Sequence, residues 1–199
     1  MSTSGLRPGA VGLVGLGGMQ RIYPCELTVE EYVSSEAHRQ VMADTVCPLC
    51  QRGGRLQRHG SYGRWTTSKL GVAVWILIAR FLCTVCRRTV SYLPSFALSY
   101  RVMRAATFEA FLDGDLRDLG VRRWESLLKS YERRMHAFHP ELLRVVGRGF
   151  GRAPPSRAAF WPWLKEACGS MTAATRRLVD HFKITVFRSY QCHQPCGVL

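Results

Sequence analysis

Two pairs of cysteines are the residues of this chain best suited to chemistry. Cys47 and Cys50 form one C-x-x-C pair, and Cys83 and Cys86 form a second pair after 32 intervening residues. Each pair can present two thiolates from one tight turn, and two such turns supply the four sulfur ligands of a tetrahedral site of the kind that Zn²⁺ prefers. Four thiolates leave no open position for a water molecule, so the predicted metal is structural.

Iron is the alternative metal, because rubredoxin-like sites use the same four thiolates. The charge around the cysteines favours zinc. Residues 47–104 carry ten Lys and Arg and no Asp or Glu, and an electron-transfer module has little use for that excess. A surface with such an imbalance attracts polyanions, above all nucleic acid. We therefore expect Zn²⁺ as the cofactor and DNA as the partner, with RNA as an alternative.

The charge of the whole chain points in the same direction. Its 199 residues carry a formal charge of +14, with a pI near 10. Residues 1–46 hold three basic and five acidic side chains, and residues 105–199 hold fifteen basic and nine acidic ones. Between these segments the arginines alternate with aromatic and β-branched residues, which is typical of a folded basic surface. The candidate nucleic-acid contacts there are Arg52, Arg55, Arg58, Arg64, Lys69, Arg80, Arg87 and Arg88.

Three aromatic residues, Tyr62, Trp65 and Trp75, lie among these basic side chains. They can stack on bases, or they can cover the thin core of a small domain. The core interpretation is favoured for each of them, since a domain of this size has few other apolar groups to bury.

Strands must position the cysteines. Gly53 and Gly54 follow the first pair and are expected to permit the positive φ that its turn needs. We predict a zinc ribbon over residues 46–103. Its elements follow in the order cysteine turn, two antiparallel strands, second cysteine turn and a further strand. The segments rich in β-forming residues that lead into or away from a cysteine pair are 56–65, 72–83 and 87–92.

The segments before the ribbon are expected to pack around it or to remain flexible. Residues 1–24 predict a flexible Gly-rich leader, whose first 22 positions can also come from an over-extended start site. Residues 25–45 predict a short acidic helix, in which Thr28 and Glu31 have the spacing of a capping box.

A helical period follows the ribbon over residues 104–146 and predicts a helix-turn-helix. Its first helix ends at Asp113-Gly114, and a short helix and a glycine turn follow, with Leu116, Leu119 and Val121 around Gly120. The longer third helix opens at Val121 and ends near Met135. Arg122 and Arg123 stand where groove-facing residues of a recognition helix lie, although a solvated helix face is the alternative. Trp124 beside them is expected in the core.

The C-terminal part is expected to hold a linker over 147–156 and then helices and a tail over 157–199. Its elements are helices over 157–168 and 172–181 and a short strand over 184–187. A second metal site is conceivable but disfavoured, because its residues are irregularly spaced. Those residues are Cys168, Cys192, His193 and Cys196.

The predicted fold class is therefore α+β: a small zinc-ribbon β domain followed by a mostly helical, helix-turn-helix-like region. No secretory signal pattern and no apolar run of transmembrane length is present, so a cytoplasmic, nucleoid-associated protein without a membrane partner is expected. No carboxylate triad, Ser/His/Asp pattern or phosphate-binding loop is found, so neither an enzyme nor a small-molecule substrate is predicted.

Several spaced elements together resemble the zinc-ribbon region of insertion-sequence transposases and of related short prokaryotic proteins. They are Cys47-Pro-Leu-Cys50, then Arg58-His59-Gly60-Ser-Tyr62-Gly-Arg64, then Arg80-Phe-Leu-Cys83-Thr-Val-Cys86, and Ser91-Tyr-Leu93-Pro94. The likeness covers about residues 46–103. The segment from Val121 to Trp124 is similar, less specifically, to the helix-turn-helix that follows the ribbon in such proteins.

The resemblance implies a bacterial origin, zinc on the four cysteines and DNA as the partner. Transposases of this kind continue into an RNase-H-like domain with three catalytic acids, for which no residues are found here. The expected function is thus a DNA-binding protein, transposon-associated or regulatory, without that catalytic domain. An adaptor that docks a transposase or an RNA polymerase is the alternative. A nuclease or recombinase is a weaker, third possibility.

Overall fold

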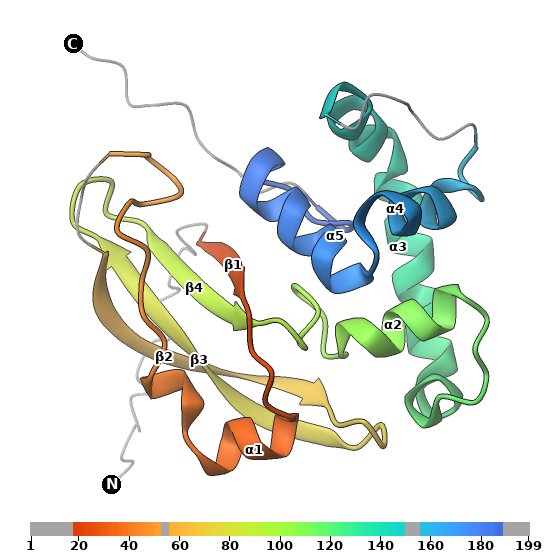
Figure 1. Ribbon diagram of the computed structural model, residues 1–199, viewed down its shortest axis with the longest axis horizontal. Coiled ribbons are helices and arrows are strands. Elements are labelled where there is room, and N and C mark those ends of the chain that lie inside the picture. Colours follow the sequence, from red (N-terminus) through yellow and green to blue (C-terminus); the bar gives the residue numbers. More distant parts are fainter. Residues whose placement is uncertain (1–17, 53–55, 150–155, 189–199) are drawn as a thin grey trace, which may run out of the picture.

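The computed structural model describes residues 18–52, 56–149 and 156–188. One four-stranded sheet lies beside a group of helices, which confirms the mixed α+β class (Figure 1). The order of the strands in the sheet is β1-β4-β3-β2. The strands are β1 (Met19–Tyr23), β2 (Leu56–Thr67), β3 (Ala73–Cys83) and β4 (Thr89–Pro94).

The longest strands of the sheet, β2 at its edge and β3 beside it, form an antiparallel hairpin in which Trp65 pairs with Trp75. β4 continues the antiparallel pairing on the other side of β3. A bulge between Arg58 and Ser61 accommodates one extra residue on β2, and Gly60 adopts a φ of 90° within it. The predicted order of two antiparallel strands, a cysteine turn and a third strand is confirmed.

The prediction of a flexible leader over residues 1–24 is wrong for Met19–Tyr23. These residues form β1, which pairs in parallel with β4, so that Met19 lies opposite Val90. Met19 and Ile22 are buried, and their burial offsets the entropy lost on ordering the strand. A five-residue strand whose partner is distant in the sequence carries almost no local signal. Residues 1–17 lie outside the described part of the chain.

The acidic segment forms a shorter helix than the predicted range 25–45. α1 (Val29–Ser34) begins with the predicted capping box, since Thr28 accepts from the Glu31 N–H and Glu31 accepts from the Thr28 N–H. A 3₁₀ turn, η1 (Ala37–Arg39), follows. The Tyr32 hydroxyl of α1 donates to the Leu77 carbonyl at 2.9 Å. The helix is thereby fixed to the central strand β3.

Each face of the sheet is covered over part of its length. Ile76 and Ile78 of β3 pack with α1, whereas Ala79 and Phe81 pack on the other face, around Val41 and the cysteines. Neighbouring residues join different clusters because side chains alternate along a strand. The metal-ligand candidates therefore belong to the core of one face of the sheet.

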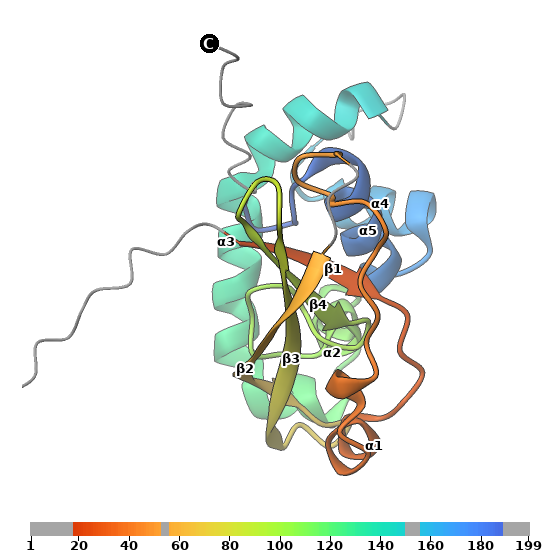
Figure 2. The ribbon, with the colours of Figure 1, turned by 90° about the vertical axis from the view of Figure 1, so that its left-hand side faces the viewer.

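The helices lie together beside the sheet (Figure 2). Their own core is built around Phe108, Leu128 and Phe160. None of the helices in the described ranges is both long and apolar enough to cross a bilayer. The helices are α2 (Ala105–Leu112), α3 (Leu119–Gly149), α4 (Phe160–Cys168), α5 (Met171–Arg177) and a π-helical turn, η2 (Leu178–Phe182).

The three-helix pattern predicted over residues 104–146 is only partly right: α3 is broken at Trp124, whose φ of −119° and ψ of 22° are not helical, so a short helical segment precedes the longer one, but at other residues than predicted. α2 ends at Leu112, before Asp113-Gly114, as expected, but residues 113–118 form turns and no short helix. Gly120 lies inside α3, where it packs against Gly71 of the hairpin and Thr107 of α2. This glycine permits a close contact and does not mark a turn. α3 also continues past Met135 to residue 149, so the predicted linker begins too early.

The strand predicted over residues 184–187 is also absent. Ile184, Val186 and Phe187 are buried in the helical core. Thr185 makes a local turn instead, because its backbone N–H donates to the Arg188 carbonyl and its hydroxyl accepts from the Phe187 N–H. The β-branched residues reflect burial in the helical core, and in the described part of the chain only Ile184 of this segment takes part in a β-bridge.

Candidate metal centre

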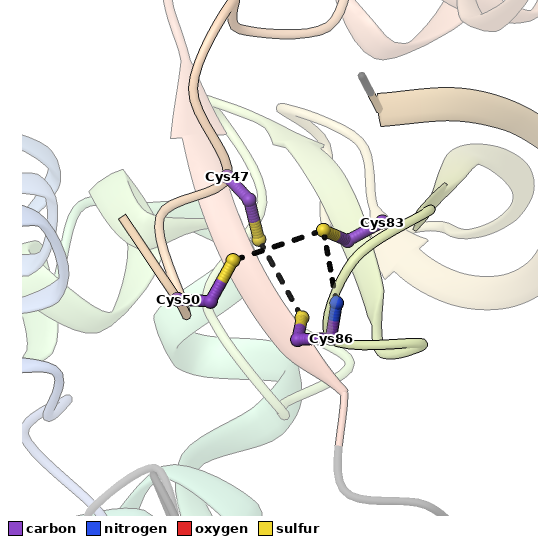
Figure 3. Close-up of side chains that lie close together, drawn as sticks. All are labelled: Cys47, Cys50, Cys83 and Cys86. Atoms are coloured by element: carbon purple, nitrogen blue, oxygen red, sulfur yellow. Dashed lines mark hydrogen bonds between the residues drawn. The ribbon is translucent and has the colours of Figure 1, made fainter. Parts of the chain in front are cut away.

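The four predicted cysteines lie together at one end of the hairpin (Figure 3). Cys47 and Cys50 lie in the turn that precedes β2, Cys83 is the last residue of β3, and Cys86 lies in the turn before β4. The Cys47 and Cys86 sulfurs are 3.9 Å apart, and those of Cys50 and Cys83 are 3.8 Å apart. All four sulfurs lie within 4.8 Å of one another.

These separations match a tetrahedral metal site. A Zn–S bond length of about 2.3 Å at tetrahedral angles places neighbouring sulfurs about 3.8 Å apart. Sulfurs joined in a disulfide would be only about 2.05 Å apart, and all four cysteines are free. The residues thus fit a four-coordinate metal ion.

Both cysteine turns have the same backbone design. The Gln51 N–H donates to the Cys47 carbonyl at 2.8 Å, and the Arg87 N–H donates to the Cys83 carbonyl at 3.0 Å. Gln51 and Arg87, each directly after the second cysteine of its pair, have φ of 53° and 56°. The positive φ expected at Gly53 and Gly54 is therefore found at Gln51, and the two glycines lie outside the described residues.

Hydrogen bonds and burial act on the thiols in opposite directions. Cys47 and Cys83 are buried, and Cys50 and Cys86 are half-buried. Burial raises the pKa of Cys47 and raises the pKa of Cys86 to about 12. Burial acts in the same way at Cys83, but N–H groups of Cys86 and Val85 outweigh it and bring the pKa of Cys83 to about 7. A bound cation would stabilise the thiolate form of all four groups.

Apart from Arg58, the exposed basic residues that we predicted fall into two groups at opposite ends of the hairpin. Arg52 and Arg87 are exposed beside the cysteine turns, where Arg88 is half-buried. Lys69 at the hairpin tip and Arg122 and Arg123 at the start of α3 are exposed at the other end. Because β2 has 12 residues, the two ends are roughly 35–40 Å apart at about 3.3 Å per residue. Arg55 lies outside the described residues.

Three other predicted contacts have structural partners. Arg58 donates to the carbonyls of residues 38, 39 and 41, which ties η1 to β2. Arg64 donates to the Leu98 and Arg101 carbonyls in the loop after β4. Arg80 donates to the Thr89 hydroxyl and lies over the ring of Tyr62. These guanidinium groups hold the fold, so they contribute less to any surface contact than the sequence suggested.

The core interpretation of the two sheet tryptophans is wrong. Trp65 and Trp75 are 49% and 48% exposed and meet edge to face, with ring centres 5.1 Å apart. A Cβ at Gly63 would lie 2.0 Å from the Trp75 indole, so this ring lies directly on the glycine backbone. Tyr62 is half-buried and accepts from the Gln20 amide. Trp124 packs against the helical core, as expected, and its indole N–H donates to the Gly71 carbonyl at 2.7 Å.

No second metal cluster is seen in the described ranges: the four cysteines are the one group there of three or more potential ligands. Cys168 is half-buried in α4. Its proposed companions Cys192, His193 and Cys196 lie outside the described residues. Sequence reasoning also missed a group of arginines around Arg101, described below, because no motif spacing links its members.

The comparisons with known proteins give one family match. Residues 47–130 match a family described as "Domain of unknown function (DUF6431)". The matched region begins at the first cysteine and includes the hairpin, β4, α2 and the start of α3. Neither a curated protein nor a solved structure matches the chain.

Proposed function

We propose that this chain is a DNA-binding protein whose sheet is stabilised by a structural Zn²⁺ on Cys47, Cys50, Cys83 and Cys86. The observation that supports it most is the combination of a four-sulfur site with exposed arginines beside it that have no acidic partner. Among the described residues, neither Arg52 nor Arg87 forms an ion pair. The zinc-ribbon character of this region is part of the proposal.

The negative charge of a metal-loaded site would not neutralise the basic side chains around it. One Zn²⁺ and four thiolates carry a formal charge of −2, whereas residues 47–104 carry ten basic side chains and no acidic ones. Subtracting two from ten leaves an excess of eight positive charges. A polyanion is the partner that stabilises such an excess, because each phosphate contact also releases condensed counterions.

A salt series on DNA binding tests the proposal. The affinity of the zinc-loaded chain for a random labelled duplex is measured by fluorescence anisotropy between about 50 and 200 mM salt. With five exposed contacts the slope of log K against log salt should be about −4.5, and Arg52→Gln with Arg87→Gln should make it less steep by about 2. Arg117→Gln removes one charge already paired with Asp115 and serves as the control. No binding at about 50 mM salt would overturn the proposal.

The transposon-associated or regulatory role rests on the resemblance of the cysteine-strand pattern to transposase ribbons. In this proposal the chain positions a complex on DNA and performs no strand transfer itself. The gene neighbourhood tests this assignment. Flanking inverted repeats or an adjacent integrase-type reading frame would support the mobile-element role, and their absence in several genomes would favour transcription control.

An adaptor is the second candidate function, and one observation favours it. Trp65, Trp75 and Leu77 form an exposed apolar row on the hairpin, and a row without charge suits an apolar surface of a partner protein. Trp65→Ala with Trp75→Ala distinguishes the candidates. The adaptor role predicts loss of binding to a transposase or RNA polymerase with unchanged DNA affinity. Leu116→Ala, which removes an exposed leucine elsewhere, is the control.

A further inference from the structure

A group of arginines converges away from the cysteines, where the loop after β4, α3 and the C-terminal segment meet. The Arg101 guanidinium lies 4.4 Å from the ring centre of Phe187 and 5.3 Å from that of Tyr131 on α3. Its Nη1 donates to the Tyr100 carbonyl at 2.9 Å. Arg188 lies over the ring of Tyr100 at 4.8 Å. Aromatic rings therefore hold both guanidinium groups in fixed orientations.

Two more arginines add charge to the same place. Arg64 reaches beneath the loop and donates to the Leu98 and Arg101 carbonyls. Arg134 is exposed one turn beyond Tyr131 on α3. Burial first, and then the charges of Arg134 and Arg188, lower the pKa of Arg101. Burial raises the pKa of Tyr131, and the charges of Arg101, Arg64 and Arg134 act to lower it.

No acidic side chain balances this group. All 14 Asp and Glu residues of the sequence lie within the described ranges. None of them forms an ion pair with Arg64, Arg101, Arg134 or Arg188 in the part of the chain that the structure describes. The Nε of Arg101 is buried without a hydrogen-bond partner there. Because the charges of Arg134 and Arg188 act on Arg101 and no acidic side chain offsets them, an external anion would stabilise the group.

We propose that Arg101, Arg134 and Arg188 bind a phosphate group. A guanidinium presents a planar fork of N–H donors that matches the oxygens of a phosphate, and the flanking rings fix that fork before the ligand arrives. The anion site follows from the charges alone. Its assignment to a backbone phosphate of DNA rests on the proposed function, with free phosphate as the other source of the same chemistry.

The first experiment uses inorganic phosphate alone. The melting temperature of the zinc-loaded full chain is compared in phosphate and in chloride of equal ionic strength. Phosphate should raise it, and the increase should be smaller in the double variant Arg134→Gln/Arg188→Gln, whose residues are both exposed, because only the general stabilising effect of phosphate remains there. Arg144→Gln on α3, where the arginine pairs with Glu141, is the control and should keep the full increase. An equal increase in the double variant would overturn the site.

The second experiment measures duplex affinity of the same variants over the salt series. Losing two phosphate contacts should make the slope of log K against log salt less steep by about 2. If the phosphate effect is smaller in the double variant but the variant binds DNA as the parent does, the anion site is supported and its role on DNA is refuted. A phosphate effect without any DNA binding by the parent chain would refute the proposed function alone. Unchanged behaviour in both experiments would refute the site.

Discussion

At the scale of single residues, the most informative pair is Gln51 and Arg87. Both have left-handed backbone conformations directly after a C-x-x-C pair, where glycine is the residue that adopts them most readily. A side chain in that conformation is held at a cost of about 1 kcal/mol, so the surrounding turn must fix it. Four converging sulfurs and a shared metal would provide such a constraint. The cysteines would then hold the backbone of Gln51 and Arg87 in place, although neither of these residues is a metal ligand.

Replacing a buried ligand should therefore affect both metal content and folding. Cys83→Ser is expected to lose stoichiometric zinc and to destabilise the chain by at least about 2 kcal/mol, because the binding energy of a structural metal contributes directly to folding. Zinc content after desalting and the thermal melting curve measure this. Cys168→Ser alters a half-buried cysteine outside the site and should keep its zinc. A Cys83→Ser protein with full zinc content and unchanged melting would refute the four-thiolate site.

A buried histidine makes a separate prediction about pH. His139 is buried edge to face against Phe160, and burial lowers its pKa below the ordinary value of 6.5. The unfolded chain then binds the proton more tightly, so stability from this residue is full above about pH 6.5 and is lost as the pH falls below it. His139→Leu should reduce the loss of stability between pH 7.5 and 5.5, measured by urea unfolding. A His139→Leu variant that loses as much stability as the parent over this range would contradict the prediction.

At the scale of elements, the contact between the hairpin tip and α3 joins the sheet to the helices. Gly71 has a φ of 72°, and a Cβ there would lie 2.9 Å from the Cα of Gly120. The indole of Trp124 adds a hydrogen bond to the Gly71 carbonyl. Two glycines thus allow two backbones to meet where side chains would separate them.

Alanine substitutions at glycines with positive φ should separate the cost of backbone strain from the cost of a clash with Gly120. Gly71→Ala is expected to destabilise the chain by about 2–3 kcal/mol, since it adds a backbone clash to the strain of a positive φ. Gly114→Ala has the same strain, with a φ of 73° and open space around it, and should cost about 1 kcal/mol. Denaturant unfolding of the two variants measures the difference. Equal effects would mean that the contact with Gly120 is unimportant.

Elements with local signals could be predicted from the sequence, and elements defined by distant contacts could not. The alternating β-formers before Cys83 predict β3, and Thr28 with Glu31 predicts the start of α1. Met19–Tyr23 gave no such signal, because its partner strand is far away in the sequence. Gly120 misled the helix prediction, since a glycine needed for close packing looks the same as one that ends a helix. The four cysteines were predictable because metal ligands have a fixed spacing.

At the scale of the whole molecule, the region that matches the family is smaller than the part of the chain that forms the sheet and the helical core. Residues 47–130 contain the cysteines and the hairpin, but β1 and α1 complete the sheet from outside that range. The helical core also needs partners beyond residue 130, including Leu142, Phe160 and Met171. The matched region therefore forms only part of each hydrophobic core.

A fragment of residues 47–130 tests this conclusion. It should bind zinc through its four cysteines, yet its helical part should lack a cooperative thermal transition, because the residues that cover Phe108 and Leu128 are missing. Circular dichroism melting of the fragment, compared with residues 18–188, measures the difference. A fragment that melts cooperatively at the temperature of the longer chain would show that the region folds independently.

The parallel strand β1 has a consequence for synthesis on the ribosome. β1 leaves the exit tunnel first, but its partner β4 follows much later, and Asp180, which pairs with Arg21 of β1 at 3.2 Å, comes near the end. Long-range pairings of this kind form slowly and late. A nascent chain, or one terminated before β4, would therefore expose β1 without its partner strand, and an unpaired strand is a template for aggregation. Chaperone dependence during translation is the expected cost of closing the sheet with its own N-terminal strand.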